Sequence, residues 1–192
     1  MGKFIVFEGS DGSGKTTRVE KIVKRLNLHG YKSEFTKEPQ NTIPGSKVIK
    51  GKDTFNYSLE DRELHQEALI RGKEENQFLF CDRYALSGAV YHSYNSEVCY
   101  ERYKSQRDLF LQPDLTIFVN TPLEECKSRI LDRKVTVAYD LENIEAFRNM
   151  YLHTLWKSVE NKVDEKIFII KGENLEEDLQ NIFSYLINTF LK

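Results

Sequence analysis

Two glycines, a lysine and a threonine near the start of the chain have the spacing of a phosphate-binding loop. In the stretch FEGSDGSGKTT (residues 7–17), four residues separate Gly9 from Gly14, and Lys15 and Thr16 follow directly. Glycine admits backbone conformations that side chains would block, so successive amides can turn inward around a phosphate. The lysine of such a loop reaches the β- and γ-phosphates, and the threonine hydroxyl ligates Mg²⁺. A chance match in such a chain has a probability on the order of 1%. The pattern therefore predicts an ATP-type nucleotide site formed by Ser10, Asp11, Gly12, Ser13, Gly14, Lys15, Thr16 and Thr17.

A second group of residues has the chemistry to hold another phosphate. Asp82 and Arg83 follow the apolar run FLFC, which places an acid and a base at the end of a buried strand. Asp82 can orient Mg²⁺ through water, and the Arg83 guanidinium forms a fork that suits a phosphate. A surface ion pair between the two is the plainer alternative. Lys37 and Arg62 supply further positive charge, so the sequence predicts phosphoryl transfer to a second, phosphorylated small molecule.

The elements that position these residues alternate along the chain. Short apolar runs predict strands, and the stretches between them have helical periodicity. The predicted strands are 4–7, 31–37, 78–81, 115–119 and 167–170. The predicted helical stretches include 19–26, 58–75, 98–111, 142–160 and a clear final stripe over 175–190. Unbroken apolar strands joined by helices predict an α/β fold in which a five-stranded parallel sheet lies between two helical layers. We expect one domain over residues 1–192, with a mobile loop over 127–139.

Composition excludes several other classes of function. The chain has 28 Lys and Arg against 30 Asp and Glu, a net charge of −2, which argues against a duplex DNA or anionic membrane surface as partner. No apolar run approaches the roughly 20 residues that cross a bilayer. Three widely spaced cysteines lack metal-ligand spacing and indicate a reducing compartment, so we expect a cytoplasmic protein.

Two other kinds of phosphate-loop protein compete with the small-molecule kinase. Residues 161–164 match the N-K-x-D pattern of guanine-reading switch proteins, but they follow a helical stretch rather than a strand, and a solvated helix end is the favoured interpretation. A nucleotide-binding regulator without transferase activity is the other candidate. Arg83 and Lys37 favour an acceptor that carries a phosphate.

The sequence resembles the thymidylate kinase family over nearly its whole length. The segments that carry the resemblance are FEGSDGSGKTT, TKEPQNTIPG, LEDRELH, FLFCDRYALSGAVYHSYN and PDLTIFVNTPLEECKSRI. The resemblance implies a P-loop NTPase-type three-layer sandwich that transfers a phosphoryl group from ATP to dTMP with Mg²⁺, within dTTP synthesis. It also implies a homodimer. A kinase of the same fold for another deoxynucleotide or a deoxynucleoside remains the closest alternative.

The resemblance also implies an acceptor pocket. Asp11 would contact the 3′-hydroxyl of the sugar, Arg62 the thymine edge and Arg83 the dTMP phosphate, and Tyr91 would lie near the ribose. Asp82 would help to hold Mg²⁺. The residues expected to bind the substrate are Asp11, Lys37, Pro39, Tyr57, Arg62, Arg83, Ser87, Tyr91 and Tyr139.

Departures from the family pattern fall in this pocket and in the phosphate-binding loop. Lys37 stands where an arginine is usual, and Ser58 stands where many members have a phenylalanine that stacks on thymine. Gly12 occupies the place of a catalytic arginine found in some members. The chain therefore resembles the class that takes arginines from a lid, here 127–142, and Arg129 and Arg133 are the candidates.

Overall fold

Five strands form one parallel sheet in the computed structural model, which describes residues 2–43, 54–133, 138–161 and 166–191. Their order across the sheet is β2-β3-β1-β4-β5. The strands are β1 (Lys3–Glu8), β2 (Ser33–Lys37), β3 (Phe78–Asp82), β4 (Leu115–Val119) and β5 (Ile167–Ile170). The five predicted strands and their parallel arrangement are confirmed.

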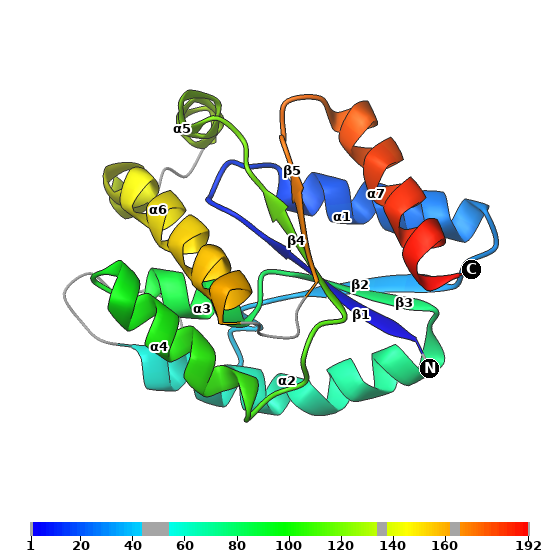
Figure 1. Cartoon of the computed structure of the whole chain (residues 1–192), viewed down its shortest axis with the longest axis horizontal. Helices are drawn as coiled ribbons and strands as arrows, with labels where there is room; N and C mark the ends of the chain where they lie inside the picture. Colours follow the sequence, from blue (N-terminus) through cyan, green and yellow to red (C-terminus); the bar gives the residue numbers. More distant parts are fainter. Residues whose placement is uncertain (1, 44–53, 134–137, 162–165, 192) are drawn as a thin grey trace.

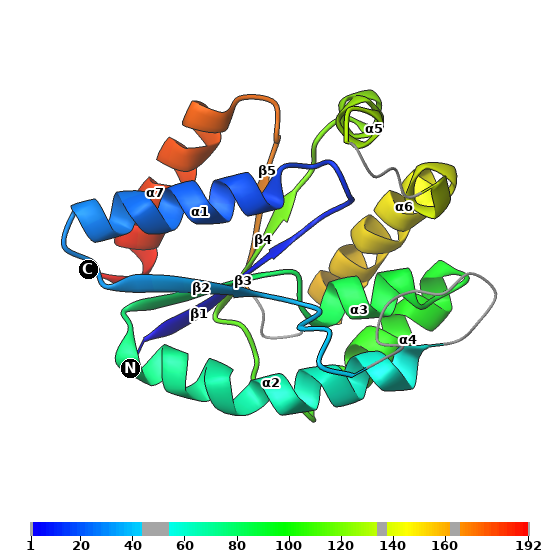
Figure 2. The same cartoon turned by 180° about the vertical axis from the view of Figure 1, so that it is seen from behind.

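Helices cover both faces of this sheet (Figures 1 and 2). Helices α1 (Lys15–Leu28) and α7 (Leu175–Phe190) lie on one face. The other face carries α2 (Phe55–Glu75), α3 (Ala85–Tyr91), α4 (Ser96–Arg107) and α6 (Ala138–Glu160), and α5 (Leu123–Leu131) packs beside α6. The three-layer α/β sandwich is as predicted.

The two cores follow from the alternation of side chains along the strands. Successive residues of a strand point to opposite faces. In β1, Phe4 and Val6 join the core beneath α2, α3, α4 and α6, whereas Ile5 and Phe7 join the core beneath α1 and α7. Since both faces are covered, β1 is buried from Phe4 to Glu8, which explains the unbroken apolar run FIVF.

The structure corrects three details of the sequence interpretation. Helix α3 was not predicted, because its seven residues are nearly all small or apolar and show no polar face. Helix α4 ends at Arg107 rather than near residue 111. Of the loop predicted over 127–139, residues 127–131 continue α5, since Cys126 and Ile130 lie one helical turn apart and both pack against Ile144. Residues 138–139 begin α6, and 134–137 lie outside the described residues.

The order of the strands places the ends of β1, β3 and β4 together. From β1 the chain proceeds to β2 and β3 on one side and to β4 and β5 on the other. In open α/β sheets, ligands bind beyond the carboxyl ends of the strands at such a switch point.

Among the described residues, no helix is both long and apolar enough to cross a membrane.

Candidate active site

The predicted phosphate-binding loop joins β1 to α1 at the centre of the sheet. Gly12 has φ 75°, and a Cβ there would lie 2.4 Å from the backbone oxygen of Cys126. Gly14 has φ 80° and forms the N-cap of α1 without a side-chain bond. Both positions therefore require glycine. Ser10 and Ser13 are buried in the loop, and the loop amides precede the N-terminus of a 14-residue helix, a favourable setting for an anion.

The Lys15 ammonium is buried inside this loop. Its Nζ donates to the backbone oxygens of Gly9 at 2.8 Å and Ser10 at 2.9 Å, and to Ser13 Oγ at 3.3 Å. Burial, with a smaller contribution from the Arg83 guanidinium, lowers the pKa of Lys15 to about 8. The loop thus holds the cation at the point where its glycines leave room for phosphate.

Thr16, in the first turn of α1, meets Asp82 at the end of β3. The Thr16 hydroxyl donates to Asp82 Oδ2, and both residues are those predicted to hold Mg²⁺. Asp82 is buried, and its Oδ1 has no hydrogen-bond partner in the described part of the chain. A hydroxyl and a carboxylate are ligands that suit a hard cation such as Mg²⁺, and a buried carboxylate oxygen without a partner calls for one. The pair therefore fits a magnesium site.

Arg83 and Arg133 converge on Asp11 of the phosphate-binding loop. Arg83 Nη2 lies 2.5 Å from Asp11 Oδ1, and Arg133 Nη1 lies 3.6 Å from Asp11 Oδ2. The Arg83 guanidinium also stacks over the Tyr91 ring, 4.8 Å from its centroid. Arg83 has a φ of 69°, an unusual value that clusters at functional sites. Residues far apart in the sequence thus form one cationic cluster beside the loop.

Arg129 contacts the backbone of the loop. Its Nη1 donates to the backbone oxygen of Gly12 at 3.2 Å, and its Nη2 pairs with Glu125 one turn earlier in α5. Both predicted lid arginines therefore contact the phosphate-binding loop, Arg129 through a backbone oxygen and Arg133 through Asp11.

Glu8 connects the phosphate-binding loop to the segment that carries Arg83, although no sequence motif predicts this role. Its carboxylate accepts from the backbone amides of Tyr84 at 3.0 Å and Ser87 at 3.1 Å, and also from the Ser87 hydroxyl. Burial raises the pKa of Glu8, although the bonds from Ser87 oppose this effect. The signal was a single acid at the end of the apolar run FIVF. The Ser87 hydroxyl, which belongs to one of the predicted substrate-binding residues, is buried between Glu8 and the Tyr151 hydroxyl, 2.7 Å away.

Arg62 forms a buried ion pair with Glu38, a second residue that the sequence analysis missed. Arg62 Nε and Nη2 lie 2.8 and 2.6 Å from Glu38 Oε2, and Nη1 donates to Gln106. The guanidinium lies over the Tyr84 ring, 5.0 Å from its centroid. A Cβ at Gly88 would approach Arg62 Nη2 to 2.9 Å, so α3 accommodates the guanidinium at a glycine. These bonds use three of the five N–H groups of Arg62.

The remaining predicted residues belong to several elements. Lys37 and Pro39 are exposed at the end of β2, Tyr57 is exposed on the first turn of α2, and Thr17 is exposed on α1. Tyr139 and Tyr91 both pack against Phe147, with ring centroids 5.8 and 4.6 Å from it. Of the N-K-x-D pattern, Asn161 follows the end of α6, and residues 162–164 lie outside the described residues.

Comparisons with known proteins agree with this geometry. The family model described as thymidylate kinase matches residues 7–182. A thymidylate kinase of Caldicellulosiruptor saccharolyticus is 32% identical, with 100% of this chain and 98% of the relative covered. A thymidylate kinase of Orientia tsutsugamushi is 30% identical, with 100% and 95% covered.

A solved structure shares the fold. The thymidylate kinase of Candida albicans superposes with a TM-score of 0.71 at 19% identity, covering 97% of this chain and 92% of the other. Taken together with the match over residues 7–182 and the full-length relatives, the P-loop and the arginine cluster identify the chain as a member of the thymidylate kinase family.

Proposed function

We infer that the protein transfers the terminal phosphoryl group of ATP to dTMP, giving dTDP and ADP for dTTP synthesis. Family membership supports this reaction, and neither alternative acceptors nor a regulatory role has comparable support. The observation that carries the proposal is the ion pair between Arg83 and Asp11 of the P-loop. It places the guanidinium that suits the phosphate of the acceptor substrate next to the site for the donor nucleotide.

On the donor side, the loop amides and Lys15 bind the phosphates of ATP. Phosphoryl transfer needs alignment and charge compensation more than covalent chemistry from the protein. Thr16 and Asp82 would hold Mg²⁺, which neutralises charge on the donor phosphates when bound. The ATP-binding residues that we propose are Ser10, Asp11, Gly12, Ser13, Gly14, Lys15, Thr16 and Thr17.

On the acceptor side, Arg83 positions the dTMP phosphate in line with the donor. Its stacking on Tyr91 and its ion pair with Asp11 hold the guanidinium beside the P-loop and support this role. We assign the sugar hydroxyl to Asp11 and the base edge to the remaining N–H groups of Arg62. Lys37, Pro39, Tyr57, Ser87, Tyr91 and Tyr139 complete the proposed pocket.

Residues 127–142 form the proposed lid. Arg129 and Arg133 lie in its first part, and both already contact the P-loop. An arginine that stabilises the transferring group is worth roughly 10³–10⁵ in rate in related chemistry. Closure of such a segment also excludes water and limits hydrolysis of ATP.

One assay separates the candidate functions. ATP consumption is measured with Mg²⁺ and with dTMP, dUMP, dGMP, dCMP or thymidine in parallel reactions. We expect stimulation by dTMP well above the others. Stimulation by a different acceptor alone would assign the chain to that substrate, and no stimulation by any acceptor would favour the nucleotide-binding regulator.

We also propose a cytoplasmic homodimer that associates through helices beside the sheet. Large apolar side chains are exposed on two helices of one face, and these are Leu64 and Ile70 of α2 and Trp156 and Val159 of α6. All three cysteines are free thiols, which fits a reducing compartment. The mass in solution, measured by light scattering, tests the dimer, and a monomer at micromolar concentration would contradict it.

A further inference from the structure

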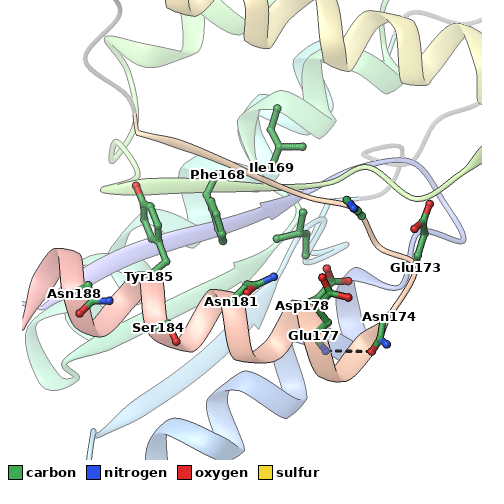
Figure 3. A pocket seen from close by; sticks show the side chains of 12 residues that line it. Phe168, Ile169, Glu173, Asn174, Glu177, Asp178, Asn181, Ser184, Tyr185 and Asn188 are labelled. Carbon is green, nitrogen blue, oxygen red and sulfur yellow. Dashed lines mark hydrogen bonds between the residues drawn. The ribbon is translucent and has the colours of Figure 1, made fainter.

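Arg18 forms a buried ion pair between α1 and α7. Its Nε and Nη2 lie 2.9 and 2.5 Å from Asp178 Oδ2, and the two side chains are 3% and 6% exposed. Asp178 stands in the first turn of α7, whose N-cap Asn174 accepts from the Glu177 amide at 3.1 Å (Figure 3). The acid is therefore fixed at a helix N-terminus, and it holds one edge of the Arg18 guanidinium.

The other edge of the guanidinium faces two backbone carbonyl groups of the P-loop. Arg18 Nη1 lies 3.4 Å from the backbone oxygen of Ser13 and 3.3 Å from that of Gly14. The hydroxyl of Thr121, which follows β4, also donates to the Ser13 oxygen, at 2.9 Å. The Gly14 oxygen also accepts from the Arg18 backbone amide at 3.2 Å, so each of these two carbonyl groups has the Arg18 side chain and one other donor as partners.

The geometry of the peptide bond converts these contacts into an orientation of the amides. In a trans peptide the C=O and N–H groups point in opposite directions. A Ser13 oxygen held outward turns the Gly14 amide inward, and a Gly14 oxygen held outward does the same for the Lys15 amide. These amides belong to the part of the loop that surrounds phosphate.

Gly14 is what allows the guanidinium to lie so close. A Cβ on residue 14 would lie 2.6 Å from Arg18 Nη1, and the φ of 80° also disfavours a side chain there. The loop glycine and the arginine four residues later therefore fit together.

We propose that Arg18 is a positioning residue for the donor phosphates: anchored by Asp178, it fixes the peptide planes at Ser13 and Gly14 so that the Gly14 and Lys15 amides face the nucleotide. This role rests on the proposed function only in that ATP is the donor. Arg18 contacts only the donor loop and touches no reacting atom. A change at Arg18 should therefore alter the affinity for ATP and leave the KM for dTMP unchanged.

The test compares Arg18→Lys with Arg25→Lys. A lysine at 18 can still pair with Asp178 but, lacking the planar fork, cannot also hold the two carbonyl oxygens. Arg25 is a matched control, because its Nη2 pairs with Glu176 at 2.5 Å and so joins the same two helices away from the loop. Binding of ATP with Mg²⁺ is measured by calorimetry, and the KM for dTMP by steady-state turnover.

We expect Arg18→Lys to weaken ATP binding about tenfold or more, the equivalent of losing one charge-assisted hydrogen bond. The KM for dTMP and the melting temperature should stay close to those of the wild type, as should every property of Arg25→Lys. Unchanged ATP binding in Arg18→Lys would overturn the proposal. So would equal losses for ATP and dTMP, or an equal loss in Arg25→Lys.

A second variant covers the case in which Arg18→Lys does not fold. Arg18→Met combined with Asp178→Asn removes both charges of the pair, which avoids leaving one of them buried alone. We expect this double variant to be folded and weak in ATP binding, and wild-type affinity would refute the role of Arg18. ATP binding is read without any acceptor, so a wild-type enzyme that fails to use dTMP would overturn the proposed function and leave this test intact.

Discussion

Replacement of Glu38 by glutamine should destabilise the protein strongly, because it leaves Arg62 as a buried charge without its counter-ion. The two side chains are 3% and 5% exposed, and both contacts to Glu38 Oε2 are shorter than 3 Å. Burial would lower the pKa of Arg62, but the charge and the hydrogen bonds of Glu38, together with smaller contributions from Tyr84 and Glu8, raise it. Glutamine keeps the shape of the side chain and one acceptor oxygen, so the change isolates the charge.

The expected loss can be given a magnitude. Removing one partner of a buried ion pair costs about 3–5 kcal/mol. For a chain of this size each kcal/mol shifts the melting temperature by about 2–4 °C, so the melting temperature should fall by roughly 6–20 °C. Urea unfolding and calorimetry measure the two quantities. The retained acceptor of glutamine favours the lower end of both ranges.

Two further variants make the measurement decisive. Glu124→Gln breaks an ion pair with Lys127 in which the side chains are 86% and 38% exposed, and it should leave the stability of the protein nearly unchanged. Arg62→Met combined with Glu38→Gln removes both buried charges and should recover much of the stability. A loss below about 1 kcal/mol for Glu38→Gln alone would refute the reasoning, since Arg62 would then be solvated in spite of its burial.

Three other predictions follow from the site and the core. Because the pKa of Lys15 is about 8 and phosphate favours its charged form, binding of ADP at pH 8.5 should take up about three quarters of a proton, and almost none at pH 6.5. Calorimetry in buffers of different ionisation enthalpy measures this uptake. The same heat of ADP binding in every buffer at pH 8.5 would contradict the prediction. Arg83→Ala should raise the KM for dTMP about a hundredfold while ATP affinity changes only a few-fold, and a normal KM in steady-state kinetics would exclude the assigned role. Cys81, Cys99 and Cys126 are buried and burial raises their pKa values, so a thiol reagent should label none of them quickly in the native protein and all three in denaturant.

Local sequence patterns predicted the strands and the P-loop because each depends on neighbouring residues. The unbroken apolar runs of β1, β3 and β4 are what burial on both faces requires, and residues within a few positions of Gly14 define the loop. Helix α3 is not predicted from the sequence, because ALSGAVY is short and shows no helical alternation of apolar and polar residues. The extension of α5 to Leu131 depends on packing against Ile144 of α6, a contact that composition does not reveal.

The supporting residues of the site could not be predicted in this way. Arg18 meets Asp178 across 160 positions, and Glu8 meets Ser87 across 79. In the sequence Arg18 is one polar residue on a helix that has several others, and its burial follows only from the packing of α7 against α1. A residue that acts through the backbone of a motif has no signature of its own, whereas the motif does.

The arrangement also explains how a chain with a net charge of −2 can hold a cluster of cationic side chains beside its phosphate-binding loop. The charges at the site have internal partners: Asp11 pairs with Arg83 and Arg133, and the loop carbonyls of Gly9 and Ser10 accept from Lys15. These partners reduce the repulsion between cations that would otherwise oppose folding. Binding of two anionic nucleotides then exchanges internal acceptors for phosphate oxygens. The free energy gained is the difference between the two sets of contacts, so strengthening the pairs with Asp11 would stabilise the fold and weaken the binding of substrate.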